Sequence, residues 1–283
     1  MSVGRRIRWI CLLLLICVFS KTVDFLILRG DVTYRLWSRL RPHSALALQK
    51  TEVDELRSWT LAELEDEGIV ASNLLMLVSA DHPLPRDYEA ILAEYNGARM
   101  HPEMVAPYIA LRDTVEAKTG VRIYVSSDFR SAEEQEAILA ESPTNIAAPV
   151  GGSEHEAGLA LDVYAPYFAG EEFIRSAAGR AVGELCADYG FIIRYPLGGE
   201  DVTGIVYEPW HLRYVGAPHA ELMSESGMLL EEYIQALAVG QWYSYGDYLI
   251  CRQSIDNLLL PATWSDVDLS LDNTGYCIVT VKR

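Results

Sequence analysis

Two stretches, SEHEAGLALD (residues 153–162) and EPWH (residues 208–211), decide both the fold and the chemistry predicted for this chain. They contain His155, Asp162 and His211, two imidazoles and a carboxylate that can hold a divalent zinc ion while one coordination position stays open for water. Glu208 precedes the last histidine by three residues and is the candidate general base. Together the two stretches predict a zinc-dependent hydrolase.

The residues around these ligands predict the strands that bring them together. Apolar residues alternate with others over 159–164, so Asp162 is expected on the strand face opposite the core. His211 begins a second strand-like run at 211–215, and the two strands have to be neighbours in one sheet for the ligands to meet. Gly158 lies where the chain turns from a loop into the first strand.

Arg130 is the second candidate catalytic residue. It follows a strand predicted over 121–127, and Ser131 with Glu134 forms a capping-box pattern that opens a helix at 135–140. The guanidinium could stabilise negative charge on a tetrahedral intermediate. It could instead clamp a substrate carboxylate. Both roles of Arg130 stay open at this point. Glu154 and Glu156, the two acids that flank His155, are expected to be solvated.

Composition predicts a folded chain that does not bind nucleic acid. Half of the 283 residues are hydrophobic and 22% are charged, which is typical of one large or two modest globular domains. The net charge of -17 leaves no surplus of Lys and Arg to neutralise phosphates.

The hydrophobic periodicity predicts further elements along the chain. Helices are predicted at 56–67, 88–95, 106–118, 173–189 and 229–237, and strands at 74–78, 191–195, 205–208, 248–252 and 276–281.

The first 30 residues have the layout of an export signal. Arg5, Arg6 and Arg8 precede an apolar run at 9–19, which continues at 25–28. No small-x-small cleavage site follows, so a retained signal-anchor is favoured over a cleaved peptide. The protein is therefore expected in the cell membrane as a single-pass protein with its catalytic domain outside, or as a secreted protein if the signal is cleaved.

The remaining chain divides into three predicted segments. These are a stem at 31–71, a catalytic domain at 72–222 and a small β-rich module at 223–283. Only Cys251 and Cys277 could form a disulfide in an oxidising compartment, and unpaired buried thiols explain them equally well.

The two opening stretches resemble the zinc D-alanyl-D-alanine carboxypeptidases of the VanY type, with their pattern Ser-x-His-x-x-Gly-x-Ala-x-Asp and Glu-x-Trp-His. SDFRS (127–131) is similar to that family's Ser-Gly-Tyr-Arg-Ser, GFIIRYP (190–196) to its Gly-Phe-x-x-Arg-Tyr-Pro, and WHLRYVG (210–216) is also similar. The resemblance covers 72–222, about half the chain. Asp128 and Phe129 depart from the family's glycine and tyrosine, which puts substrate preference in question but removes no ligand.

The resemblance implies an α+β fold, shared with the Hedgehog signalling domain, in which helices pack on a mainly antiparallel sheet. It implies removal of the terminal D-alanine from peptidoglycan stem peptides or their lipid-linked precursors. In a resistance setting, this removes the ends that glycopeptide antibiotics bind. The implied roles are zinc ligands for His155, Asp162 and His211, general base for Glu208 and transition-state stabiliser for Arg130. Candidate substrate contacts are Ser153, Gln135 and Ser127.

Three alternatives accompany this interpretation. An LD-carboxypeptidase acting on tetrapeptide stems could use the same metal chemistry. A free-dipeptide hydrolase of the VanX type is disfavoured, because export would separate it from the cytoplasmic dipeptides. A wall-binding module without catalysis could keep the fold, but it would have no use for the base Glu208.

Overall fold

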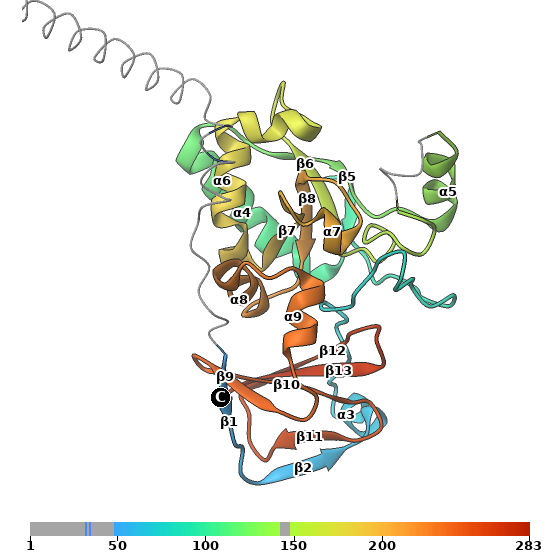
Figure 1. Cartoon of the computed structure of the whole chain (residues 1–283), viewed down its shortest axis with the longest axis vertical. Coiled ribbons are helices and arrows are strands. Elements are labelled where there is room, and N and C mark those ends of the chain that lie inside the picture. Colours follow the sequence, from blue (N-terminus) through green and yellow to red (C-terminus); the bar gives the residue numbers. More distant parts are fainter. Residues whose placement is uncertain (1–31, 33, 35–47, 142–147) are drawn as a thin grey trace, which may run out of the picture.

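The computed structural model describes residues 32, 34, 48–141 and 148–283, and Figure 1 shows how their elements are arranged. The apolar anchor predicted for residues 1–30 lies outside this part of the chain. Within the described residues, no helix combines the length and the apolar character needed to cross a bilayer.

A four-stranded antiparallel sheet, in the order β5-β6-β8-β7, is the scaffold of the predicted catalytic half. Its strands are β5 (Tyr124–Ser127), β6 (Ala160–Tyr164), β7 (Phe191–Tyr195) and β8 (Glu208–Tyr214). Asp162 on β6 lies opposite His211 on β8. The predicted α+β fold with an antiparallel sheet is therefore confirmed, and so is the pairing of the two ligand-bearing strands.

Helices α4 (Pro102–Thr119) and α6 (Ala177–Leu185) pack on one face of this sheet (Figure 1). Proline at the first position of α4 and the left-handed Gly120 after its end fix the limits of that helix. Leu161 and Val163 of β6 point into the same core, so Asp162 projects from the other face.

The helix predicted at 173–189 is divided into three pieces. The 3-10 turns η1 (Gly170–Arg175) and η2 (Cys186–Tyr189) flank α6. The cause of the first break is Ser176, whose extended backbone and side chain cap α6; its hydroxyl accepts a bond from the amide of Gly179 at 2.8 Å.

The predicted stem is wrong for residues 49–66, which belong to a β-rich unit with the C-terminal residues (Figure 1). β1 (Gln49–Thr51) and β2 (Leu56–Trp59) pair with C-terminal strands, and only α3 (Leu61–Asp66) of the helix predicted at 56–67 is helical. The sheet runs β1-β9-β10-β13-β12, and β11 pairs with β2. The C-terminal strands are β9 (Trp242–Tyr245), β10 (Tyr248–Ser254), β11 (Leu258–Pro261), β12 (Asp266–Leu271) and β13 (Tyr276–Lys282).

Helices α8 (His219–Ser226) and α9 (Leu230–Ala236) join this unit to the catalytic half. One apolar cluster contains Ile192 of β7, Leu230 of α9 and Ile278 of β13. The two halves therefore share a core. The thiols of Cys251 and Cys277 are buried and free on the paired strands β10 and β13.

Three local predictions fail for identifiable reasons. Residues 74–78 are buried but form no strand, because their backbone bonds go elsewhere, for example from the amide of Leu75 to Ser270 Oγ at 2.7 Å. Residues 88–95 form no helix; β3 (Ala93–Tyr95) pairs with β4 (Ala98–Met100) through a tight turn at 96–97, where both residues have positive φ. Of the strand predicted at 205–208, only Glu208 is in β8.

Two further helices lie within the described residues of the catalytic half. The predicted capping box opens α5 (Ala132–Glu141): the amide of Ser131 donates to the Glu134 carboxylate, and the amide of Glu134 donates to the Ser131 hydroxyl. The other is the short α7 (Glu200–Thr203).

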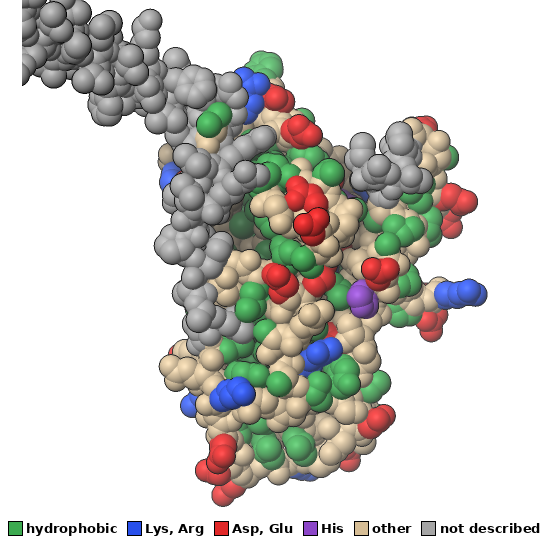
Figure 2. All heavy atoms as spheres, in the orientation of Figure 1, with side chains coloured by type: hydrophobic (Ala, Val, Ile, Leu, Met, Phe, Trp, Pro, Cys, Tyr) green, Lys and Arg blue, Asp and Glu red, His purple; other side chains and the backbone are tan. Residues whose placement is uncertain are grey.

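On the face drawn in Figure 2, acidic side chains are scattered and basic ones gather in no patch.

Candidate metal centre

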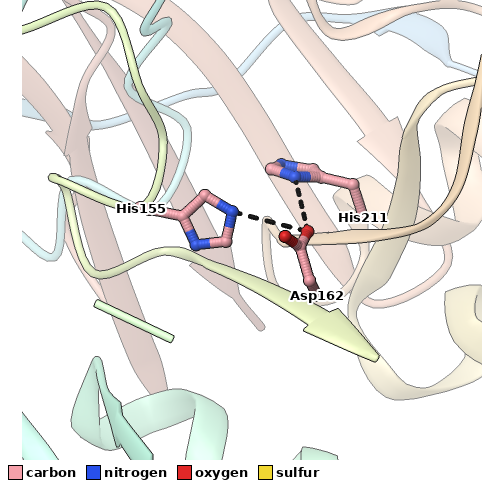
Figure 3. A group of neighbouring side chains, drawn as sticks. All are labelled: His155, Asp162 and His211. Atoms are coloured by element: carbon pink, nitrogen blue, oxygen red, sulfur yellow. Dashed lines mark hydrogen bonds and ion pairs between the residues drawn. The ribbon is translucent and has the colours of Figure 1, made fainter. Parts of the chain in front are cut away.

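His155, Asp162 and His211 converge on the sheet face opposite α4 and α6, and Figure 3 shows their side chains pointing toward one another. His155 lies in the turn before β6, Asp162 on β6 and His211 on β8. One donor atom from each lies within 4.8 Å of the others. The sequence prediction that three separate positions meet is confirmed in geometry.

The distances among these atoms fit a zinc ion. Oδ1 of Asp162 lies 3.4 Å from Nε2 of His155 and 3.1 Å from Nδ1 of His211. Ligands about 2.0–2.2 Å from a tetrahedral zinc are about 3.3 Å apart, so these separations need little adjustment. Two nitrogens and one oxygen also match the donor set of catalytic zinc sites, which leave a fourth position open.

Each imidazole is oriented by a hydrogen bond on its outer nitrogen. Nδ1 of His155 donates to the backbone carbonyl of Asp128 at 2.8 Å, so its Nε2 faces the centre. Nε2 of His211 donates to Oε2 of Glu154 at 3.3 Å, so its Nδ1 faces the centre. Such outer bonds fix the tautomer and leave the inner nitrogen free to bind a metal.

Glu154 is not solvated as predicted but is only 1% exposed. Its Oε1 accepts bonds at 2.7 Å from Nε of Arg194 on β7 and from Nη1 of Arg213 on β8. Glu156 was also predicted to be solvated; it is buried, and its carboxylate accepts a bond from the amide of Gly151 at 2.9 Å. Both acids are internal because the turn that carries His155 is packed against the sheet.

The two arginines extend the network of Glu154 to distant segments. Arg194 forms a bidentate pair with Glu231 on α9, with N–O distances of 2.9 and 2.5 Å. Arg213 also donates from Nη2 to the carbonyls of Leu74 and Met76 at 2.9 and 2.7 Å. These bonds explain why residues 74–78 lie buried without a strand partner. They also connect the C-terminal unit to the bond that orients His211.

The charges around the centre favour a cation. Burial alone would raise the pKa of Asp162, but bonds from His155 and His211 hold that pKa well below its usual value. Burial alone would lower the pKa of His211, but the carboxylates of Asp162 and Glu154 outweigh it and raise the pKa to about 10. Positive charge is therefore stabilised where a divalent ion would lie.

Glu208 lies beside the centre, with Oε2 at 3.8 Å from Nδ1 of His211. Burial raises the pKa of the Glu208 carboxyl to about 7; the negative charges of Asp162 and Glu154 act in the same direction, and His211 and Arg130 oppose them. A carboxyl with a pKa near neutrality can both accept and return a proton.

Arg130 is held in place by two of the predicted substrate contacts. It donates from Nη1 to Gln135 at 2.7 Å and from Nη2 to the hydroxyl of Ser127 at 2.9 Å. Ser153 is buried directly before Glu154. The substrate contacts of Ser127, Gln135 and Ser153 stay a prediction.

The sequence interpretation missed Glu154, Arg194, Arg213 and Tyr195, whose ring lies 4.9 Å from that of His211. A signal for the arginines was present: strands β7 and β8 are otherwise largely apolar, and a buried guanidinium needs an acidic partner. No local pattern identifies Glu154 as that partner.

Comparison with known proteins agrees with this geometry. Residues 97–217 match the VanY family, described as D-alanyl-D-alanine carboxypeptidase. A D-alanyl-D-alanine carboxypeptidase of Enterococcus faecium is 32% identical over 62% of this chain, which spans 61% of that enzyme's length. The bifunctional D-Ala-D-Ala dipeptidase and carboxypeptidase VanXYC of Enterococcus gallinarum is 32% identical over 59% of this chain and 96% of its own.

Three solved structures are also similar. The D,D-dipeptidase VanXYg, in complex with a D-Ala-D-Ala phosphinate analogue, has a TM-score of 0.65 and 26% identity over 81% of this chain and 99% of its own. The D,D-pentapeptidase VanY of a VanB-type cassette, in complex with Zn(II), has a TM-score of 0.50 and 33% identity over 56% and 98%. The LD-carboxypeptidase LdcB has a TM-score of 0.53 and 28% identity over 66% and 94%.

Glu154→Gln is expected to weaken zinc binding by about 10- to 100-fold, because an amide orients His211 less strongly than a carboxylate does. Zinc affinity of the full chain is measured by competition with a chromogenic chelator. Glu136→Gln, at an exposed position on α5, makes the same charge change and should leave the affinity as it was. A lower melting temperature of Glu154→Gln with unchanged zinc affinity would show that Glu154 only stabilises the fold.

Proposed function

Because this chain belongs to the VanY family of D-alanyl-D-alanine carboxypeptidases, we propose that it is a zinc-dependent enzyme that removes the terminal D-alanine from peptidoglycan stem peptides. The observation that carries the proposal is the convergence of His155, Asp162 and His211 with Glu208 at their side. A binding module would not need a buried carboxyl at that position.

In the proposed mechanism, His155, Asp162 and His211 would hold a zinc ion, which when bound would supply a Lewis acid that lowers the pKa of water to about 7 and polarises the substrate carbonyl. Glu208 accepts the proton of the attacking water and later delivers it to the amine of the leaving D-alanine. Residues three apart on a regular strand point to opposite faces, but the pairing of β7 with β8 shifts register between Ile193 and Tyr195. This irregularity lets Oε2 of Glu208 lie 3.8 Å from Nδ1 of His211, where both proton transfers are needed.

Arg130 supplies the fixed positive charge of the proposed site. Its guanidinium is anchored by Ser127 and Gln135, and its charge acts on Glu208 across the site. A charge held in this way stabilises the oxyanion that develops on the scissile carbonyl without reorganising. Binding of the substrate's terminal carboxylate is the alternative role for Arg130.

The proposed substrate lies outside the cytoplasm. The basic and apolar residues at 5–19 support a membrane anchor that leaves the enzyme on the outer side, where stem peptides and lipid-linked precursors are accessible. Removal of the terminal D-alanine there would eliminate D-Ala-D-Ala ends and so contribute to glycopeptide resistance. This agrees with the vancomycin-resistance enzymes among its structural neighbours.

Release of D-alanine from two synthetic stems tests the substrate class. The zinc-loaded protein is expected to shorten a pentapeptide ending in D-Ala-D-Ala by one residue and to leave a tetrapeptide ending in one D-alanine intact, as measured by mass spectrometry. The likeness to LdcB supports an LD-carboxypeptidase as the second candidate. Cleavage of the tetrapeptide alone would establish that second activity and reject the first.

Glu208→Ala is expected to lower kcat by about 10²- to 10⁴-fold, because proton transfer loses its carboxylate. Zinc content should remain one per chain, since Glu208 is not among the three converging ligands. Turnover is followed by D-alanine release and zinc by elemental analysis, with Glu136→Ala as the matched control. Turnover close to that of the parent enzyme would remove Glu208 from the mechanism.

A further inference from the structure

A pair of tyrosines lies on the same sheet face as the metal ligands. Tyr164 follows Asp162 by two residues on β6, so both side chains project from one face, about 7 Å apart along the strand. Tyr124 on β5 is directly opposite Tyr164, and the two ring centroids are 5.7 Å apart with planes at 33°. Tyr124 is 44% exposed. The pair therefore forms an accessible aromatic surface next to the candidate centre.

A cavity of about 400 Å³ follows this surface along β5. One wall is β5 with Asp128 after its end, and the other is the turn of the β3–β4 hairpin at 95–98. Tyr108 and Arg112 of α4 also line the cavity, which therefore lies at the edge of the sheet. Ser127 binds Arg130 and the carbonyl of Asp128 binds His155. The cavity therefore ends beside the candidate centre, where Ser127 lies opposite Asp162.

β5 is an edge strand, as its place at the outer side of the sheet in Figure 1 shows. Among the described residues, β6 is its only strand partner. The hairpin bonds to the segment that follows β5, where the amide of Phe129 donates to the carbonyl of Arg99 at 3.0 Å and the amide of Arg99 donates to the carboxylate of Asp128 at 2.6 Å. In the part of the chain that the structure describes, no strand covers the outer backbone groups of β5, and pairing with such an edge is a common mode of peptide recognition.

The charged groups in the cavity already have partners. Arg122 pairs with Glu116 at 2.7 Å, and Arg112 pairs with Asp113 at 2.7 Å and donates to the hydroxyl of Tyr95 at 2.6 Å. This neutral, tyrosine-rich lining suits a peptide backbone and its side chains better than a phosphate or another strong anion.

We propose that this cavity binds the substrate's peptide chain on the amino-terminal side of the scissile bond, with the chain extended along β5 and a side chain over Tyr124 and Tyr164. The inference rests on the proposed function, because the scissile bond has to lie at the metal centre. A distance of about 7 Å corresponds to roughly two extended residues, so stem residues reach the tyrosines. The sugar at the far end of a pentapeptide stem lies beyond them.

The dependence of turnover on substrate length tests this subsite. The full-length, zinc-loaded enzyme should hydrolyse a pentapeptide stem with a kcat/KM at least about tenfold above that for N-acetyl-D-Ala-D-Ala, which is too short to reach the tyrosines. Tyr124→Ala should reduce this ratio by about five- to tenfold, and Tyr124→Phe should retain it because the ring remains. Tyr167→Ala is the matched control, because Tyr167 lies near the end of β6, outside the cavity lining, and is fully exposed.

Three results would overturn the proposal. These are equal kcat/KM values for the two substrates in the parent enzyme, an unchanged ratio in Tyr124→Ala, and a fall confined to stems that carry the sugar, which would assign the cavity to the glycan. If neither peptide is cleaved, the proposed function fails separately. The subsite is then tested by calorimetric binding of the pentapeptide, and equal affinity for parent and Tyr124→Ala rejects it.

Discussion

The buried carboxylate of Glu154 is the group on which the site depends. It lies between the guanidiniums of Arg194 and Arg213 and accepts a bond from Nε2 of His211. Burying one charge without partners is costly, but here two arginines are balanced by Glu154 and by Glu231 on α9. Since each member satisfies the others, the network holds one geometry, and that geometry aims Nδ1 of His211 at the centre.

This arrangement gives the C-terminal unit a role in the site. Glu231 reaches Arg194 from α9, and α9 packs in the apolar cluster that also contains Ile192 and Ile278. The match to VanXYg covers a larger share of the chain than residues 97–217, so the likeness extends beyond the segment that carries the ligands. Along β6, Ala160 lies opposite Arg213, Asp162 opposite His211 and Tyr164 opposite Tyr124. One strand thus connects the charge network, the metal ligands and the proposed peptide subsite.

The ligands could be predicted from sequence because spacing and alternation are local properties. Asp162 follows His155 by seven residues, and strand alternation gives its face. Glu154 could not be predicted, because its partners Arg194 and Arg213 come from distant strands and an acid beside a histidine in a loop is ordinarily solvated. The same limit explains the other errors. Tertiary bonds, not local pattern, hold residues 74–78, and pairing with C-terminal strands decides the structure of residues 49–59.

Anomalous diffraction at the zinc edge, from crystals of the zinc-loaded protein, tests this account most directly. The account predicts one peak about 2.0–2.2 Å from Nε2 of His155, Nδ1 of His211 and a carboxylate oxygen of Asp162, with Nε2 of His211 still bonded to Glu154. A peak elsewhere in the molecule, or a peak at Nε2 of His211 with Glu154 turned away, would contradict it.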